Sequence, residues 1–204
     1  MKRRYNHYKY MKSLQYGQLL EYNFLQYLQF AFPKFFFLCA VHFSEIECII
    51  LRKFFFFFSL LCKYHLNFQY FMLIDIIIVD NPGKLLRFNI IYLFQSLKYN
   101  TRLRLNLYTN ECIPIQSIMS LFFSAAWMER ESWDMFGILF IGHTDLRRLL
   151  TDYGFLGFPL RKDFPVTGYY EIFYSDIQKR LIQQRVILIQ NLRFFFYPNV
   201  WVNS

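Results

Sequence analysis

The chain has very little alanine, no acidic residue before Glu21 and no long apolar run. Alanine occurs only at positions 31, 40, 125 and 126, whereas phenylalanine occurs 27 times and tyrosine 16 times. This bias is typical of proteins encoded by AT-rich genomes, and it points to an organelle genome. A membrane-spanning helix needs about 20 consecutive apolar residues, and lysine or aspartate interrupts every long apolar stretch. The sequence therefore favours a soluble protein without a transmembrane segment of its own.

Cysteine is scarce, and its spacing is unlike that of a metal site. The four cysteines at positions 39, 48, 62 and 112 form no C-x-x-C pair and no zinc or iron–sulfur spacing. This spacing predicts buried free thiols in a reducing compartment. The glycine-rich stretch from 137 to 157 follows neither the G-x-G-x-x-G pattern nor the P-loop pattern, so nucleotide binding is unsupported.

Residues 1–14 form a basic N-terminal arm. Transit peptides are also basic and poor in acids, but this segment has little serine and no clear amphipathic stripe. A protein made inside the organelle would need no transit peptide, so a solvated arm is the favoured interpretation. The net charge of +9 is compatible with nucleic acid, anionic lipid or acidic protein partners.

Residues 15–136 are predicted to form an α+β domain in which a mixed β-sheet packs against helices. The pattern predicts a helix over 16–32, because Pro33 ends it. A β-hairpin is expected from strands over 35–41 and 46–51. The phenylalanine run over 54–58 is predicted to begin a buried helix that reaches about residue 65, with a strand as the alternative.

Three further strands and a long helix complete the predicted domain. Apolar runs and alternation predict strands over 71–79, 87–95 and 101–108, separated by turn signals. The period then becomes helical, and a single helix is expected over 115–136, with Gly137 ending it.

The composition changes abruptly between 127 and 168. Eleven charged residues lie between positions 129 and 163, six acidic and five basic, and five of the seven glycines lie between 137 and 168. Opposite charges among tryptophan, glycine and proline indicate an irregular backbone held by ion pairs. Residues 137–168 are therefore predicted to form an ordered irregular docking segment. The candidate structural and interface residues are Glu129, Arg130, Glu131, Trp133, Asp134, His143, Asp145, Arg147, Arg148, Asp152, Phe158, Arg161, Lys162 and Asp163.

These residue types also allow a catalytic interpretation. His143 with Asp145 could form an oriented base, and Cys112 could act as a nucleophile. No third member of such a catalytic site is identifiable in the sequence. The carboxylates of this region also have neighbouring cations. Arg130 and Asp134, for example, are four positions apart on a predicted helix and can form an ion pair. Ion pairing is therefore the favoured interpretation, and no catalytic, cofactor-binding or metal residue is predicted.

Three stretches of this region, ERESWDMFGI, GHTDLRRLLTDYGF and GFPLRKDFPVTGY, resemble the signature of one family. This is the 30-kilodalton, NuoC-type subunit of respiratory complex I, the proton-pumping NADH:ubiquinone oxidoreductase. The resemblance is near-continuous from about residue 71 to about residue 193. It implies that Asp145 caps a short helix whose body contains Arg147 and Arg148. Thr144 stands where the family has proline, and Leu156 and Phe158 stand where it commonly has glutamate and histidine.

The resemblance implies a non-catalytic core subunit that supports electron transfer from NADH to ubiquinone coupled to proton pumping. Such a subunit belongs to the peripheral arm, on the matrix side of the mitochondrial inner membrane. It packs against the quinone-site (NuoD-type, 49-kilodalton) subunit, and FMN, iron–sulfur clusters and quinone are held by other subunits. The residue types of the run Arg161-Lys162-Asp163, with Phe158 and Pro159, are themselves typical of an element that docks on a partner's carboxylates, and a solvated charge run is the alternative. The alternatives are an organellar RNA-binding or ribosomal protein and an unrecognised hydrolase.

Residues 169–204 are expected to form an extended C-terminal tail that wraps a partner. Such a tail cannot bury its own aromatic rings, each of which covers roughly 150–250 Å². The rings concerned are Tyr169, Tyr170, Phe173, Tyr174, Phe194, Phe195, Phe196, Tyr197 and Trp201.

Overall fold

The computed structural model describes residues 16–42, 45–188, 190, 193 and 195. The chain divides into two compact units, Met1–Lys162 and Asp163–Ser204. The predicted basic arm over 1–14 lies outside the described residues, as do the predicted contacts of Phe194, Phe196, Tyr197 and Trp201.

A five-stranded mixed sheet forms the centre of the first unit, in the order β1-β2-β5-β4-β3. Strands β2 and β5 are parallel, and the other neighbours are antiparallel. The predicted mixed sheet, its first hairpin and its three later strands are therefore confirmed. The strands are β1 (Phe36–His42), β2 (Glu45–Ile50), β3 (Met72–Asp80), β4 (Phe88–Ser96) and β5 (Thr101–Thr109).

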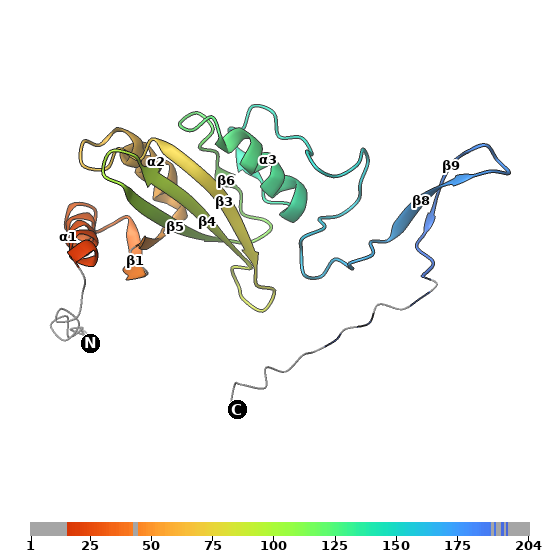
Figure 1. Ribbon diagram of the computed structural model, residues 1–204, viewed down its shortest axis with the longest axis horizontal. Helices are drawn as coiled ribbons and strands as arrows, with labels where there is room; N and C mark the ends of the chain where they lie inside the picture. Colours follow the sequence, from red (N-terminus) through yellow and green to blue (C-terminus); the bar gives the residue numbers. More distant parts are fainter. Residues whose placement is uncertain (1–15, 43–44, 189, 191–192, 194, 196–204) are drawn as a thin grey trace. The chain divides into compact units, whose positions relative to one another are not determined.

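In the described ranges, three α-helices accompany the sheet: α1 (Tyr16–Ala31), α2 (Phe55–Tyr64) and α3 (Ala125–Phe136). Figure 1 shows α1 beside β1 at one end of the sheet and α3 beside β3 at the other. The core lies on one sheet face, because burial alternates strictly along β4. The phenylalanine run forms a helix, as expected, since Phe55, Phe58 and Cys62 give it one fully buried stripe.

The prediction of one helix over 115–136 is wrong for its first part. Two-residue strand β6 (Ile115–Gln116) pairs in parallel with β7 (Phe140–Ile141). The Ile115 N–H donates to the Leu139 carbonyl and the Ser117 N–H to the Ile141 carbonyl, both at 2.9 Å. These donors are therefore committed to the sheet pair, and the helix begins only at Ala125.

Among its described residues, the second unit contains an antiparallel hairpin, β8 (Tyr170–Ser175) with β9 (Arg180–Arg185). This part of the expected tail is therefore paired with itself rather than extended throughout. Tyr170, Ile172 and Tyr174 are all exposed on the hairpin. A lone two-stranded hairpin is at best marginally stable in water, and the expectation that a partner covers this part of the chain stays a prediction.

Candidate functional site

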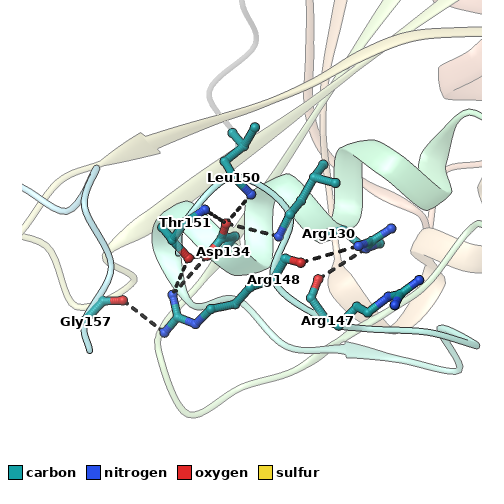
Figure 2. A network of polar contacts seen from close by, with 8 residues as sticks. Arg130, Asp134, Arg147, Arg148, Leu150, Thr151 and Gly157 are labelled. Carbon is teal, nitrogen blue, oxygen red and sulfur yellow. Dashed lines mark hydrogen bonds and ion pairs between the residues drawn. The ribbon is translucent and has the colours of Figure 1, made fainter. Parts of the chain in front are cut away.

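The candidate site is centred on Asp134, near the end of α3, whose side chain is fully buried. Its Oδ1 accepts from the Arg148 guanidinium at 2.9 Å and from the Thr151 hydroxyl at 2.6 Å. Its Oδ2 accepts from three successive backbone N–H groups, of residues 149–151, at 3.2, 2.7 and 2.8 Å. Figure 2 shows these donors converging on the carboxylate from a stretch without regular structure.

The ionised form of Asp134 is strongly favoured. Burial alone would raise its pKa, but hydrogen bonds from Thr151, from the Leu150 N–H and from Arg148 outweigh burial and lower the pKa to about 2. Asp134 is therefore ionised near neutral pH, and it anchors residues 148–151 to α3.

The contacts of Arg130, Arg147 and Arg148 differ from the predicted ones. Arg130 does not pair with Asp134; it donates to the carbonyls of Arg147 and Arg148 at 3.2 and 3.4 Å and stacks on Trp127. It is Arg148 that forms the ion pair with Asp134, and it also donates to the Gly157 carbonyl at 3.1 Å (Figure 2). Arg147 pairs with Asp145 at 2.9 Å, and both side chains are exposed.

The predicted short helix that begins at Asp145 is absent. The Asp145 N–H donates to His143 Nδ1 at 3.1 Å, and the other ring nitrogen of His143 lies 3.1 Å from the Ala126 carbonyl. The following N–H groups are used by Asp134 rather than by helix turns. His143 thus fastens the loop to the start of α3, and its carboxylate neighbour faces Arg147 instead of orienting it as a base.

Glu129 is the second buried carboxylate of α3. Ser117 donates its hydroxyl to Oε2 at 2.5 Å, and the Ile118 N–H donates to Oε1 at 2.9 Å. Burial raises the pKa of Glu129 to about 7, although these two hydrogen bonds oppose the shift. The pKa values of Glu129 and Asp134 are therefore shifted in opposite directions, although the two residues lie five positions apart on one helix.

Arg161 is used within the chain. It donates to the Phe136 carbonyl at 2.7 Å and pairs with Glu111 at 3.1 Å. Glu111 also binds Arg87 at 2.7 Å, and Arg87 holds buried Asp80 through two bonds of 2.6 and 2.8 Å. The Arg87 hydrogen bond is the main cause of the lowered pKa of Asp80.

The ring of Phe158 contacts the guanidinium groups of Arg148 and Arg161. The guanidinium carbons of Arg148 and Arg161 are 5.2 and 4.5 Å from its ring centre, and the Trp133 ring is 5.6 Å away. Gly137, with φ of 77°, ends α3 beside this stack. A Cβ at Gly137 would lie 2.6 Å from Arg161 Nη2 and from the Phe158 ring, so the close approach requires glycine.

The remaining predicted site residues lie at the surface. Glu131, Asp152, Lys162 and Asp163 are exposed. Sequence reasoning missed five residues that complete the polar contacts: Asp80, Arg87, Glu111, Ser117 and Thr151. The opposite charges of Asp80 and Arg87, which flank one turn, were the available signal for the first two.

Metal ligands do not cluster in the part of the chain that the structure describes. No group of three or more histidine, cysteine, aspartate or glutamate residues there could hold a metal ion. Cys48 and Cys62 are buried as predicted and Cys39 is half-buried, but Cys112 is exposed, so the prediction of four buried thiols is wrong there.

Comparison with known proteins gives consistent matches. Residues 57–170 match the family described as respiratory-chain NADH dehydrogenase, 30 Kd subunit. NADH dehydrogenase (ubiquinone) iron-sulfur protein 3 of Beta trigyna is 49% identical over 146 residues, 71% of this chain and 76% of the relative. NADH-ubiquinone oxidoreductase subunit 9 of Reclinomonas americana is 43% identical over 162 residues, 79% of this chain and 76% of the relative.

Solved structures agree with these relatives. The trypsin-resistant fragment 1-134 of Nqo5 is 25% identical, with a TM-score of 0.50 over 59% of this chain and 97% of the fragment. A chain of an archaeal membrane-bound sulfane sulfur reductase has a TM-score of 0.62 at 17% identity, covering 72% of this chain and 86% of its own length, a likeness of fold alone. These similarities give no support to the RNA-binding or ribosomal alternative. The chain belongs to the family of 30-kilodalton subunits of respiratory-chain NADH dehydrogenase.

Proposed function

We propose that this chain is a non-catalytic, structural core subunit of the peripheral arm of respiratory complex I. The observation that carries the proposal is the use of Asp134: both of its oxygens accept hydrogen bonds from the chain's own backbone and from the side chains of Arg148 and Thr151. A fixed, fully bound anion neither accepts nor releases protons near neutral pH, so it suits a rigid support rather than acid–base chemistry. Such rigidity would keep the redox centres and quinone cavity of neighbouring subunits in register.

The cofactors of the enzyme are proposed to lie on other subunits. Some relatives carry "iron-sulfur protein" in their names, but the thiols of this chain do not fit a four-thiolate cluster. Cys39 and Cys48 face each other on β1 and β2, Cys62 belongs to α2, and Cys112 is exposed. A hydrogen bond with Cys39 and burial raise the pKa of Cys48, and burial raises that of Cys62, which disfavours the thiolate form that binds iron.

The proposed partner is the quinone-site (NuoD-type) subunit, on the matrix side of the mitochondrial inner membrane. The residues from 169 to 204 would lie along it, because Tyr170, Ile172 and Tyr174 of the β8–β9 hairpin are exposed. In the described ranges, no helix has the length and apolarity that a membrane crossing demands. The candidate residues Lys162 and Asp163, which are exposed, remain proposed interface residues.

Native-gel electrophoresis of solubilised mitochondrial membranes tests this function. The polypeptide is expected to migrate with NADH-dehydrogenase activity at the position of complex I. A chain truncated after Gly168 is expected to be made but to fail to join the arm. Migration of the full chain with ribosomes, or full assembly of the truncated chain, would contradict the proposal.

A further inference from the structure

A second surface, away from Asp134, has the properties of a docking site. An apolar groove of about 470 Å³ lies at one end of the sheet. We name it the Phe37 groove; its walls are Phe37, Ile49, Leu51, Leu86, Tyr108 and Ile113. Phe37, Ile49 and Tyr108 lie on β1, β2 and β5, so the sheet fixes their spacing, whereas Leu51, Leu86 and Ile113 come from the segments after β2, before β4 and after β5.

The groove is open rather than enclosed. Phe37 is 79% exposed, and Leu51 and Leu86 are each 43% exposed. A small-molecule pocket of this size commonly buries 70–90% of its ligand, whereas exposed aromatic and aliphatic walls with arginine at the edge are typical of protein–protein contacts.

Two cations complete the groove. Arg52 and Lys53, from the 3-10 turn Arg52–Phe54 that precedes α2, are exposed members of its lining. Neither forms an ion pair with an acid among the described residues, unlike Arg87, Arg148 and Arg161. The groove therefore presents apolar contact area next to uncompensated positive charge.

We propose that the Phe37 groove binds an acidic segment of a neighbouring protein subunit. An aliphatic or aromatic side chain of that segment fills the groove, and adjacent carboxylates pair with Arg52 and Lys53. This inference rests on the proposed function, because it requires that the chain stand among other subunits. It adds a second contact surface, on the first unit, to the one proposed for residues 169–204.

Photo-cross-linking within the assembled complex tests the inference. Phe37 is replaced by p-benzoylphenylalanine in the full-length chain, and cross-linked peptides are identified by mass spectrometry. The expected product is one segment of a neighbouring subunit that carries an apolar residue close to at least one aspartate or glutamate. The same probe at Phe123, which is also 79% exposed, should not label that segment.

A synthetic peptide of the identified segment is then titrated onto the purified full-length chain. The double substitution Arg52→Gln and Lys53→Gln should weaken its binding roughly fivefold, as expected for two exposed ion pairs. Lys98→Gln, an exposed cation in the turn between β4 and β5, should leave the affinity unchanged. Equal affinity for parent and double variant would overturn the inference.

Three cross-linking outcomes would also overturn it: products only within this chain, products with a second copy of it, or products with lipid or another small molecule. A segment without acidic residues would do the same. These failures are separable from failure of the proposed function, because they leave the polypeptide migrating with complex I.

Discussion

Replacement of Asp134 by asparagine is the most discriminating perturbation of the candidate site. The asparagine side chain has the same shape but only one acceptor oxygen. If its NH2 group takes the place of Oδ2, the three N–H groups of residues 149–151 lose their acceptor; if it takes the place of Oδ1, Arg148 and Thr151 lose theirs. Each buried donor left unpaired costs about 1–3 kcal/mol, and breaking a buried charged pair costs about 3–5 kcal/mol.

We therefore expect Asp134→Asn to lower the free energy of unfolding by about 3–5 kcal/mol, a large part of the roughly 5–15 kcal/mol of a typical domain. Asp145→Asn is the matched control, because Asp145 and Arg147 are 56% and 72% exposed and their pair should contribute less than about 1 kcal/mol. The assay is urea unfolding of the purified full-length chain, with the level of assembled complex I as a second readout. Equal losses in the two variants would refute the role given to Asp134.

Three further predictions concern neighbouring residues. The raised pKa of Glu129 means that its contribution to stability is present below the ordinary value of 4.5 and is lost as pH rises through about 7. Glu129→Gln keeps hydrogen-bonding partners for Ser117 and Ile118 but cannot titrate. The free energy of unfolding of this variant, measured in urea, should therefore change less between about pH 5 and pH 8 than that of the parent protein. The same pH dependence in both proteins would disprove this. Gly137→Ala should lower the melting temperature more than Gly142→Ala does, because both residues have positive φ but only Gly137 faces Arg161 and Phe158; similar losses would show that the close approach is unimportant. Arg161→Ala should reduce the amount of assembled complex on native gels, since its side chain is 14% exposed, whereas Arg147→Ala should not. Normal assembly with loss of turnover per complex in the Arg161 variant would argue for a catalytic role instead.

The elements of the sheet were predictable because their residues alternate. Along β5, Leu103, Leu105 and Leu107 are buried, and in the sequence they alternate with Arg102, Arg104 and Asn106, which is the period-2 pattern of a strand. The helical pattern over 115–136 gave a wrong prediction for residues 115–124, and the reason is physical. Ile115 and Ser117 satisfy their N–H groups through β7, a distant strand that no local period reveals.

The composition of the sequence located the candidate site, but it did not predict which residues pair with one another there. Arg130 and Asp134 have suitable helical spacing, yet Asp134 takes donors from 14 to 17 positions later in the chain. Three of those donors are backbone N–H groups, which every residue except proline possesses and which therefore leave no mark in a sequence. The Asp80–Arg87 pair could have been anticipated, since opposite charges stand at the two ends of a hairpin turn.

The capture of three backbone N–H groups by Asp134 bears on how sequence variants of this protein should be judged. A segment held through its main chain makes few demands on its own side chains, and Leu150 is in fact 61% exposed. Substitutions at Leu149 and Leu150 should therefore be tolerated, apart from proline, which has no N–H to donate. The path of this loop is therefore set by a side chain of α3, and a substitution of Asp134 would alter residues 148–151, which lie 14 to 17 positions later in the chain.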